Sequence, residues 1–407
     1  MTKETYTLIK DEVSVKISAS APESLRNKRI KRTGVRVYKD GCLGISGYMD
    51  EEGEEAALKR AESALAYKIA YPAKPSGELK RSVAVGGKPF TPEALDAEVA
   101  ALLAALRKDF PQFALSSPFV KSGTYTEALK NDAGLDLVSA ITMHEFVFLY
   151  KMNSSASIMD GWFAYGGQEY DRKAFLDHAG QILGAHLKEV PLPKEGKLPV
   201  FFDDTEHLIK QIFASELGGM TFGSGGSLFS GKTGQKLFNE NFTLYNSRQE
   251  DHLPFFDAEG VCAEGFKYIE NGVLRAPLAD KKTAAKFNFT PSGTAAAAYD
   301  GTPSTGNSML KIKSQAKTIK EMQGGEPAIF VSMASGGDFT NEGGFGTPAQ
   351  VAFLMKDGKL VGRLPQLQLS STVYDMYGKD FLGVSSDTIM PLSNDRWLGF
   401  QLDVRKM

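Results

Sequence analysis

Two acidic side chains, Asp257 and Glu259, end an apolar run and have the residue types of an acid and base pair. Gly260 follows them. Further on, two strands are expected to turn at Asn271-Gly272, because both residues tolerate the positive φ of a type I′ hairpin turn. In a purely structural role, the two carboxylates would accept backbone or lysine hydrogen bonds at the end of a strand. We favour this structural role.

A second set of candidate residues resembles an inverted zinc motif whose first histidine has become aspartate. Asp203 and His207 are four residues apart and would share one face of a helix, with Glu206 nearby as a base. Alternatively, Asp203 and Asp204 cap the N-terminus of that helix, where carboxylates are favoured in any case. We favour capping over a metal site.

The other histidines lack partners at metal-binding spacing. His144-Glu145 begins like the helix of a zinc protease, but no second histidine follows four or five residues later, and the alternation around it predicts a strand. His178 and His186 are eight residues apart on an expected helix, and His252 lies in a polar loop. None of these histidines predicts a metal site.

Gly226 to Thr233 matches the pattern G-x-x-x-x-G-K-T, in which backbone amides and a lysine hold phosphates. A phosphate loop should leave a buried strand and enter a long helix. Here Gly223-Ser224-Gly225 precedes the match and Gly234 follows it at once. A glycine-rich corner of a sheet is the favoured interpretation, and nucleotide binding is the lesser alternative.

The composition is that of a globular protein with more than one core. The chain has 407 residues, 42% of them hydrophobic, and a formal net charge of −2, so no global attraction to nucleic acid or to an anionic membrane is expected. No stretch of about 18 apolar residues predicts a membrane span, and no signal peptide is evident. The two cysteines, Cys42 and Cys262, lie far apart, which fits a reducing compartment. We expect a cytoplasmic protein.

The N-terminal part is expected to interleave strands and helices. Alternation over residues 13–48 predicts strands, whereas residues 54–70 and 171–187 have the spacing of amphipathic helices. Thr91-Pro92 opens the clearest helix, since a capping hydroxyl followed by proline is a helix-start signal, and its apolar stripe continues to Phe110.

A segment rich in proline and charge, residues 191–199, is predicted to link an N-terminal domain (1–190) to a C-terminal domain (200–407). The second domain is rich in glycine and strands, and the 41 glycines of the chain suit a sheet that bends at corners. The predicted fold class is α+β: a mixed α/β N-terminal domain, then a C-terminal domain with a curved or barrel-like antiparallel sheet.

The chain resembles the TldD/PmbA family, the modulators of DNA gyrase, whose members are peptide-processing metalloproteases and their partner subunits. The motifs that carry the resemblance stand in the family's order: Ser227 to Gly231, Phe256 to Val261, Ile269 to Leu274, Pro291 to Thr294, and Thr302 to Ser304 followed by Asn307. The motif positions whose roles the resemblance leaves open are Asp257, Glu259, Gly260, Asn271, Gly272 and Asn307.

TldD-like members of the family carry a zinc motif, H-E-x-x-x-H, and a cysteine near the C-terminus. The family's spacing puts these positions at Lys210, Gln211 and Ser215, with Ser385 in place of the cysteine. Lysine is protonated at neutral pH, glutamine cannot act as a general base, and serine binds zinc weakly. The resemblance therefore implies a PmbA-like (TldE-like) member that has lost its zinc site, and we expect no cofactor.

In this family the two kinds of subunit form a protease that acts on unfolded peptides, in peptide maturation and proteolysis. The resemblance thus implies a partner subunit that bears zinc, a second copy of this chain, or both, together with an unfolded peptide substrate. Nucleic acid and membrane are not expected partners. A peptide-binding homodimer without catalysis is the alternative, and a self-sufficient metallopeptidase that uses Asp203, Glu206 and His207 is a further hypothesis.

Overall fold

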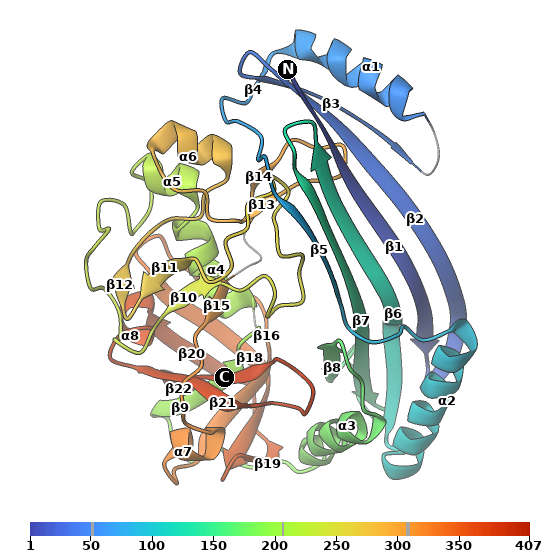
Figure 1. Ribbon diagram of the computed structural model, residues 1–407. Coiled ribbons are helices and arrows are strands. Elements are labelled where there is room, and N and C mark those ends of the chain that lie inside the picture. Colours follow the sequence, from blue (N-terminus) through green and yellow to red (C-terminus); the bar gives the residue numbers. More distant parts are fainter. Residues whose placement is uncertain (50–52, 206, 307–309) are drawn as a thin grey trace.

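The computed structural model describes residues 1–49, 53–205, 207–306 and 310–407 (Figure 1). Its N-terminal half is built on an eight-stranded sheet in the order β4-β3-β2-β1-β6-β7-β5, with β8 paired to β7. The strands are β1 (Thr2–Ser18), β2 (Ala21–Lys39), β3 (Cys42–Met49), β4 (Ile69–Ala70), β5 (Lys80–Val85), β6 (Phe113–Asn131), β7 (Asp136–Met152) and β8 (Gly161–Gly167). The long strands β1, β2, β6 and β7 form a curved wall along one side of the molecule (Figure 1).

Three helices accompany this sheet: α1 (Glu54–Ala64), α2 (Pro92–Asp109) and α3 (Arg172–His186), with a short 3₁₀ helix at Leu65–Tyr67. The Thr91 side chain caps α2 by accepting from the amide of Ala94, as the sequence predicts. The buried stripe of α2, which includes Leu95 and Leu106, packs into the same hydrophobic core as Phe175 of α3. Helices α2 and α3 lie at the end of the sheet opposite α1 (Figure 1).

The C-terminal half contains a closed five-stranded barrel in the order β16-β9-β22-β20-β18, in which β18 pairs back to β16. Its strands are β9 (Gly196–Asp203), β16 (Ala328–Ala334), β18 (Gly344–Lys356), β20 (Leu367–Thr372) and β22 (Arg396–Lys406), with β17 (Asp338–Phe339), β19 (Lys359–Arg363) and β21 (Phe381–Thr388) attached. All barrel pairs are antiparallel except β9 with β16. The predicted α+β class with a barrel-like C-terminal sheet is confirmed.

Smaller elements surround the barrel. A four-stranded sheet consists of β10 (Leu244–Asn246), β11 (Lys267–Glu270), β12 (Val273–Leu274) and β15 (Leu310–Ile312), and β13 (Ala295–Ala296) pairs with β14 (Ser304–Thr305). The helices of this half are α4 (His207–Glu216), α5 (Gly219–Gly223), α6 (Lys281–Phe287), α7 (Ile319–Gln323) and α8 (Val373–Met376). Helix α4 supplies Ile209 and Phe213 to the larger hydrophobic core.

The predicted linker over 191–199 differs from the structure in its second half. Gly196 to Pro199 already belong to β9 and pair with Gln401 to Val404 of β22. Leu198 is buried in the core of the C-terminal half, and burial of this side chain stabilises the end of the proline-rich segment as part of the sheet. Among the described residues, no helix combines the length and the apolar character needed to cross a bilayer.

Candidate functional site

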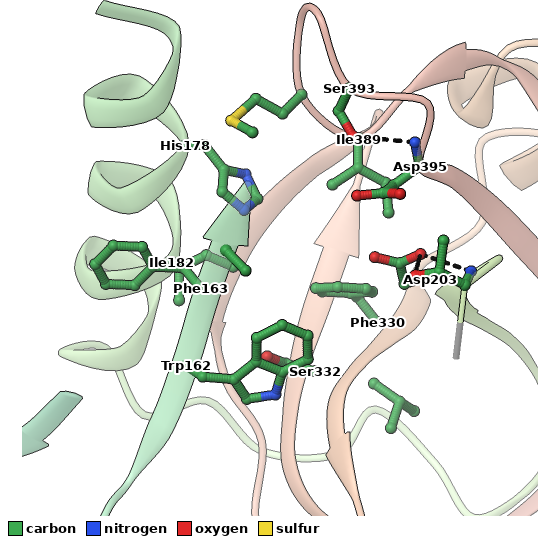
Figure 2. Close-up of a pocket in the computed structure, with 14 residues that line it drawn as sticks. Trp162, Phe163, His178, Ile182, Asp203, Phe330, Ser332, Ile389, Ser393 and Asp395 are labelled. Atoms are coloured by element: carbon green, nitrogen blue, oxygen red, sulfur yellow. Dashed lines mark hydrogen bonds between the residues drawn. The ribbon is translucent and has the colours of Figure 1, made fainter. Parts of the chain in front are cut away.

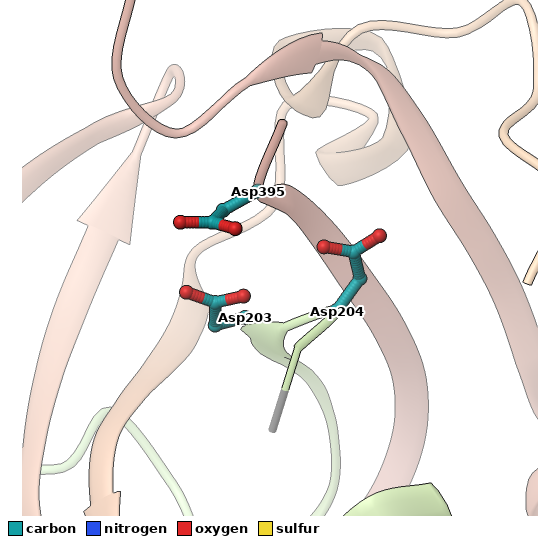
Figure 3. Close-up of side chains that lie close together, drawn as sticks. All are labelled: Asp203, Asp204 and Asp395. Carbon is teal, nitrogen blue, oxygen red and sulfur yellow. The ribbon is translucent and has the colours of Figure 1, made fainter. Parts of the chain in front are cut away.

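Three carboxylates gather where β9 ends and β22 begins: Asp203, Asp204 and Asp395 (Figure 3). Each offers an oxygen, and these oxygens lie within 4.8 Å of one another. The pairing of the two strands brings the residues together, because Asp203 is the register partner of Trp397. Asp204 accepts from the amide of Arg396 at 2.8 Å, and Asp203 accepts from the amide of Thr205 at 2.8 Å.

Burial and mutual repulsion change the ionisation of this cluster. Burial, then the charges of Asp395 and Asp204, raise the pKa of Asp203 to about 8. Burial raises the pKa of Asp204 to about 6, although the hydrogen bond from the amide of Arg396 and the charges of Lys210 and Lys311 act to lower it. Burial also raises the pKa of Asp395. The cluster therefore holds at least one proton near neutral pH.

The cluster offers only oxygen ligands. Carboxylates are the ligands of hard divalent cations, whereas protein zinc sites rely mainly on cysteine and histidine. Within the part of the chain that the structure describes, this is the one group of three or more potential ligands of this kind. It does not reproduce a histidine- and cysteine-based zinc centre.

Asp203 and Asp395 also line a cavity of about 170 Å³ between the N-terminal half and the barrel (Figure 2). Trp162 and Phe163 of β8 and Phe330 of β16 form apolar parts of its wall. His178 extends from α3 into this space (Figure 2), and burial lowers the pKa of its imidazole to about 4. The cavity therefore contains an imidazole whose pKa is lowered by burial and carboxylates whose pKa values are raised by burial.

The metal site predicted from Asp203, Glu206 and His207 is only partly described. Glu206 lies outside the described residues, and His207 is the first residue of α4. The carboxylate of Asp203 accepts hydrogen bonds from both the hydroxyl and the amide of Thr205, which closes a local turn. Its carboxylate neighbour Asp395 is far away in the sequence, and no spacing rule could have indicated that the two meet.

Of the positions assigned to the lost zinc motif, Lys210 is the one whose charge acts on the carboxylate cluster among the described residues. Lys210 of α4 donates to the carbonyl of Leu310 at 3.1 Å, and its charge lowers the pKa of Asp204. Gln211 is half-buried and Ser215 is exposed. Because α4 is a regular helix, positions 210 and 215 project about 140° apart and do not converge on one point.

Ser385 of β21, the position assigned to the family's cysteine, is fully buried. Its hydroxyl donates to the carbonyl of Asp387 at 2.7 Å and accepts from the amide of Trp397 at 3.1 Å. The first bond lies within β21, and the second joins β21 to β22. The serine thus has a structural role next to the carboxylate cluster.

The acidic pair at Asp257 and Glu259 holds a loop between the two halves of the chain. Asp257 accepts hydrogen bonds from three backbone amides: those of Glu259 and Val261 at 2.9 Å each, and that of Ala295 at 3.0 Å. Glu259 accepts from the hydroxyl of Tyr71 and from the amide of Lys281, and burial followed by the charge of Asp257 raises the pKa of Glu259 to about 7. The two carboxylates therefore act as hydrogen-bond acceptors within the fold.

Gly260 and Arg36 fasten this loop to the N-terminal sheet. Gly260 has φ +73°, and a Cβ there would meet Leu135 Cδ2 at 2.9 Å. Arg36 of β2 is fully buried, donates to the carbonyl of Ala258 at 2.6 Å and pairs with Glu4 at 3.2 Å. The segment from Asp257 to Gly260 is thus a joint between the halves, which the acidic residue types alone did not reveal.

The predicted hairpin turn at Asn271-Gly272 is present between β11 and β12, with φ +49° and +77°. A Cβ at Gly272 would meet the carbonyl oxygen of Phe238 at 2.3 Å, so this position requires glycine for packing as well as for the turn. Asn307, another motif position, lies outside the described residues.

The segment Gly226 to Thr233 does not form the strand–loop–helix arrangement of a phosphate loop. It follows α5 and consists of turns without a helix of its own. Ser227 donates to the carbonyl of Glu216 at 2.6 Å, Phe229 is fully buried, and Lys232 donates to the hydroxyl of Tyr374 at 2.9 Å. These contacts are those of a packed corner.

The remaining histidines and cysteines have ordinary surroundings. His144 of β7 hydrogen-bonds to Ser122 at 3.0 Å, and His186 of α3 to the hydroxyl of Tyr150 at 3.1 Å. His252 hydrogen-bonds to Asn394 at 2.9 Å. Neither Cys42 nor Cys262 forms a disulfide.

Comparison with protein families matches residues 195–396 to the PmbA/TldA metallopeptidase C-terminal domain. Among curated proteins, the chain is 31% identical over 234 residues to a metalloprotease of Methanothermobacter thermautotrophicus, covering 54% of this chain and 51% of that protein. It is 26% identical over 140 residues to an uncharacterized protein of Methanocaldococcus jannaschii, covering 33% of each. The chain thus spans 51% and 33% of the length of these two curated relatives.

Solved structures extend the similarity to the whole fold. TldE from Thermococcus kodakarensis superposes with a TM-score of 0.82 at 18% identity, covering 100% of this chain and 97% of that one. A putative modulator of a DNA gyrase from Thermotoga maritima gives a TM-score of 0.80 at 18% identity, covering 99% and 96%. At this identity the likeness shows the fold, and together with the domain match it confirms the predicted family resemblance.

Proposed function

Because residues 195–396 of this chain belong to the PmbA/TldD metallopeptidase-related family, we propose that the chain is a TldE-like subunit without zinc in a peptide-processing protease. In this role it completes a peptide site whose hydrolytic zinc is carried by a TldD-like partner subunit. The substrate is an unfolded peptide, which can adopt the extended conformation that a cleft or a strand edge accepts.

The observation that carries the proposal is the chemistry at the positions of the family's zinc motif. An ammonium at Lys210 repels a cation, and this side chain is engaged with the carbonyl of Leu310. The amide of Gln211 cannot activate water, and the hydroxyl of Ser385 is engaged in two hydrogen bonds. The carboxylate cluster nearby supplies oxygen ligands of the wrong class for such a centre.

The experiment measures hydrolysis of an unfolded peptide by the chain alone, by a TldD-like subunit from the same cell alone, and by their mixture. We expect no hydrolysis above background from the chain alone and a rate in the mixture well above the sum of the parts. The matched control is a partner subunit whose general-base glutamate is replaced by glutamine, which should abolish the gain. Equal rates for the mixture and the partner alone would support the homodimeric peptide-binding alternative instead.

A further inference from the structure

A cleft of about 790 Å³ opens between α5, α6 and the segment 302–306. Ala214 and Gly218, at the end of α4 and the start of α5, also line it, so the cleft begins beside Ser215, one of the lost zinc positions. Thr302 to Ser304, one of the sequence motifs that carry the family resemblance, forms the opposite wall. This cleft is separate from the cavity beside the carboxylate cluster, since the two have no lining residue in common.

Two lysines make the cleft electropositive. Lys282 and Lys286 are four residues apart on α6, so both project from the same face of the helix into the cleft lining. Both are exposed, and in the described part of the chain neither forms an ion pair. The ammonium of Lys286 lies 4.9 Å from the centre of the Phe287 ring, which leaves its charge uncompensated by a carboxylate. Two neighbouring cations without a carboxylate partner favour an anionic ligand.

One carboxylate, Asp280, stands among the described lining residues, and its acceptor capacity is used within the fold. It is 4% exposed, caps α6 by accepting from the amide of Thr283 at 2.6 Å, and accepts from the hydroxyl of Thr305 at 3.0 Å. Asp280 therefore shapes the cleft, and the two lysines outnumber this one carboxylate in the described lining.

The wall opposite α6 includes a short strand. β14 pairs with β13 through one edge, and the described residues place no strand on its other edge. Ser304 and Thr305 of β14, together with Thr302, line the cleft. An extended peptide can bond to such an edge through its main chain, while its side chains face the opposite wall.

We propose that this cleft binds an extended peptide segment rich in acidic residues, with the peptide main chain along β14 and its carboxylates at Lys282 and Lys286. The inference rests on the proposed function, in that the peptide is the substrate whose path it describes. It adds a preference for acidic sequence that this chain, and not the zinc-bearing partner, supplies.

The test uses fluorescence anisotropy with the full chain alone and two labelled unstructured peptides, one rich in glutamate and the other with glutamine at the same positions. We expect the glutamate peptide to bind roughly tenfold more tightly or better. The variant Lys282→Glu with Lys286→Glu should lose this preference, and rising salt should weaken binding of the glutamate peptide to the unchanged protein.

The matched control is Lys356→Glu with Lys359→Glu, which makes the same charge change at two exposed lysines of the β18–β19 hairpin. This control should bind as the unchanged protein does, and both variants should keep its unfolding temperature. Equal binding of the two peptides, equal loss in both variants, or competition by inorganic phosphate as effective as by peptide would overturn the proposal. None of these results depends on hydrolysis, so failure here is separable from failure of the mixed-subunit assay.

Discussion

Replacing Arg36 with alanine is expected to lower the free energy of unfolding by about 3–5 kcal/mol. The side chain is fully buried, and its removal leaves Glu4, which is 2% exposed, without its ion-pair partner, and leaves the carbonyl of Ala258 without its donor. The guanidinium also lies 4.9 Å from the centre of the Tyr6 ring, a contact that the variant loses. Urea unfolding followed by fluorescence measures the change.

Two further variants separate the buried charge from general packing loss. The double variant Arg36→Met with Glu4→Gln removes both charges at similar volume and should recover most of the stability. Arg29→Ala removes an arginine of the same strand that is 75% exposed and 4.0 Å from Asp11, and should cost less than about 1 kcal/mol. A loss as small in Arg36→Ala as in Arg29→Ala would contradict the description of a buried joint between the two halves.

Replacing Asp203 with asparagine is expected to stabilise the protein at alkaline pH and to flatten the dependence of its stability on pH. The pKa of Asp203 is raised to about 8 in the folded protein, above its value in the unfolded chain. The folded state therefore binds the Asp203 proton more tightly than the unfolded chain does. The stability that this proton adds to the folded state is fully present below about pH 4 and is lost as pH rises towards 8. Asparagine keeps an oxygen that can accept from Thr205 and removes the repulsion with Asp395.

The measurement is the unfolding temperature from pH 5 to pH 9 after treatment with a chelator, so that a bound cation does not neutralise the cluster. The variant Asp203→Asn should be more stable than the unchanged protein by an amount that grows with pH. Above pH 8 this difference in the free energy of unfolding should reach roughly 1–3 kcal/mol. Asp403→Asn, at an exposed position of β22, is the matched control and should follow the unchanged protein. Parallel curves for Asp203→Asn and the unchanged protein would show that the carboxylates do not repel one another.

The parts of the fold that depend on neighbouring residues could be predicted from the sequence. Thr91-Pro92 marks the start of α2 because capping and the fixed φ of proline act locally, and Asn271-Gly272 marks its hairpin for the same kind of reason. The glycine-rich composition indicated a curved sheet, but it could not show that β18 pairs back to β16 and closes a barrel.

The candidate site depends on contacts between distant residues, and these could not be predicted. Asp395 joins Asp203 only because β22 pairs with β9, and Arg36 reaches the carbonyl of Ala258 across 222 positions of sequence. The contacts of Asp257 and Glu259 with backbone amides and a tyrosine hydroxyl agree with the structural role that we favoured from the sequence, although the sequence could not name these partners. The positions assigned to the lost zinc motif rest on the motif order alone and stay a prediction.

We propose that this chain lacks a zinc centre of its own and works through a partner that has one. The decisive measurement is elemental analysis of the chain purified without chelator, with the variant His207→Ala analysed beside it. We predict zinc far below one ion per chain and no difference between the two proteins. One zinc ion per chain that is lost in His207→Ala would contradict the account and support a self-sufficient metallopeptidase.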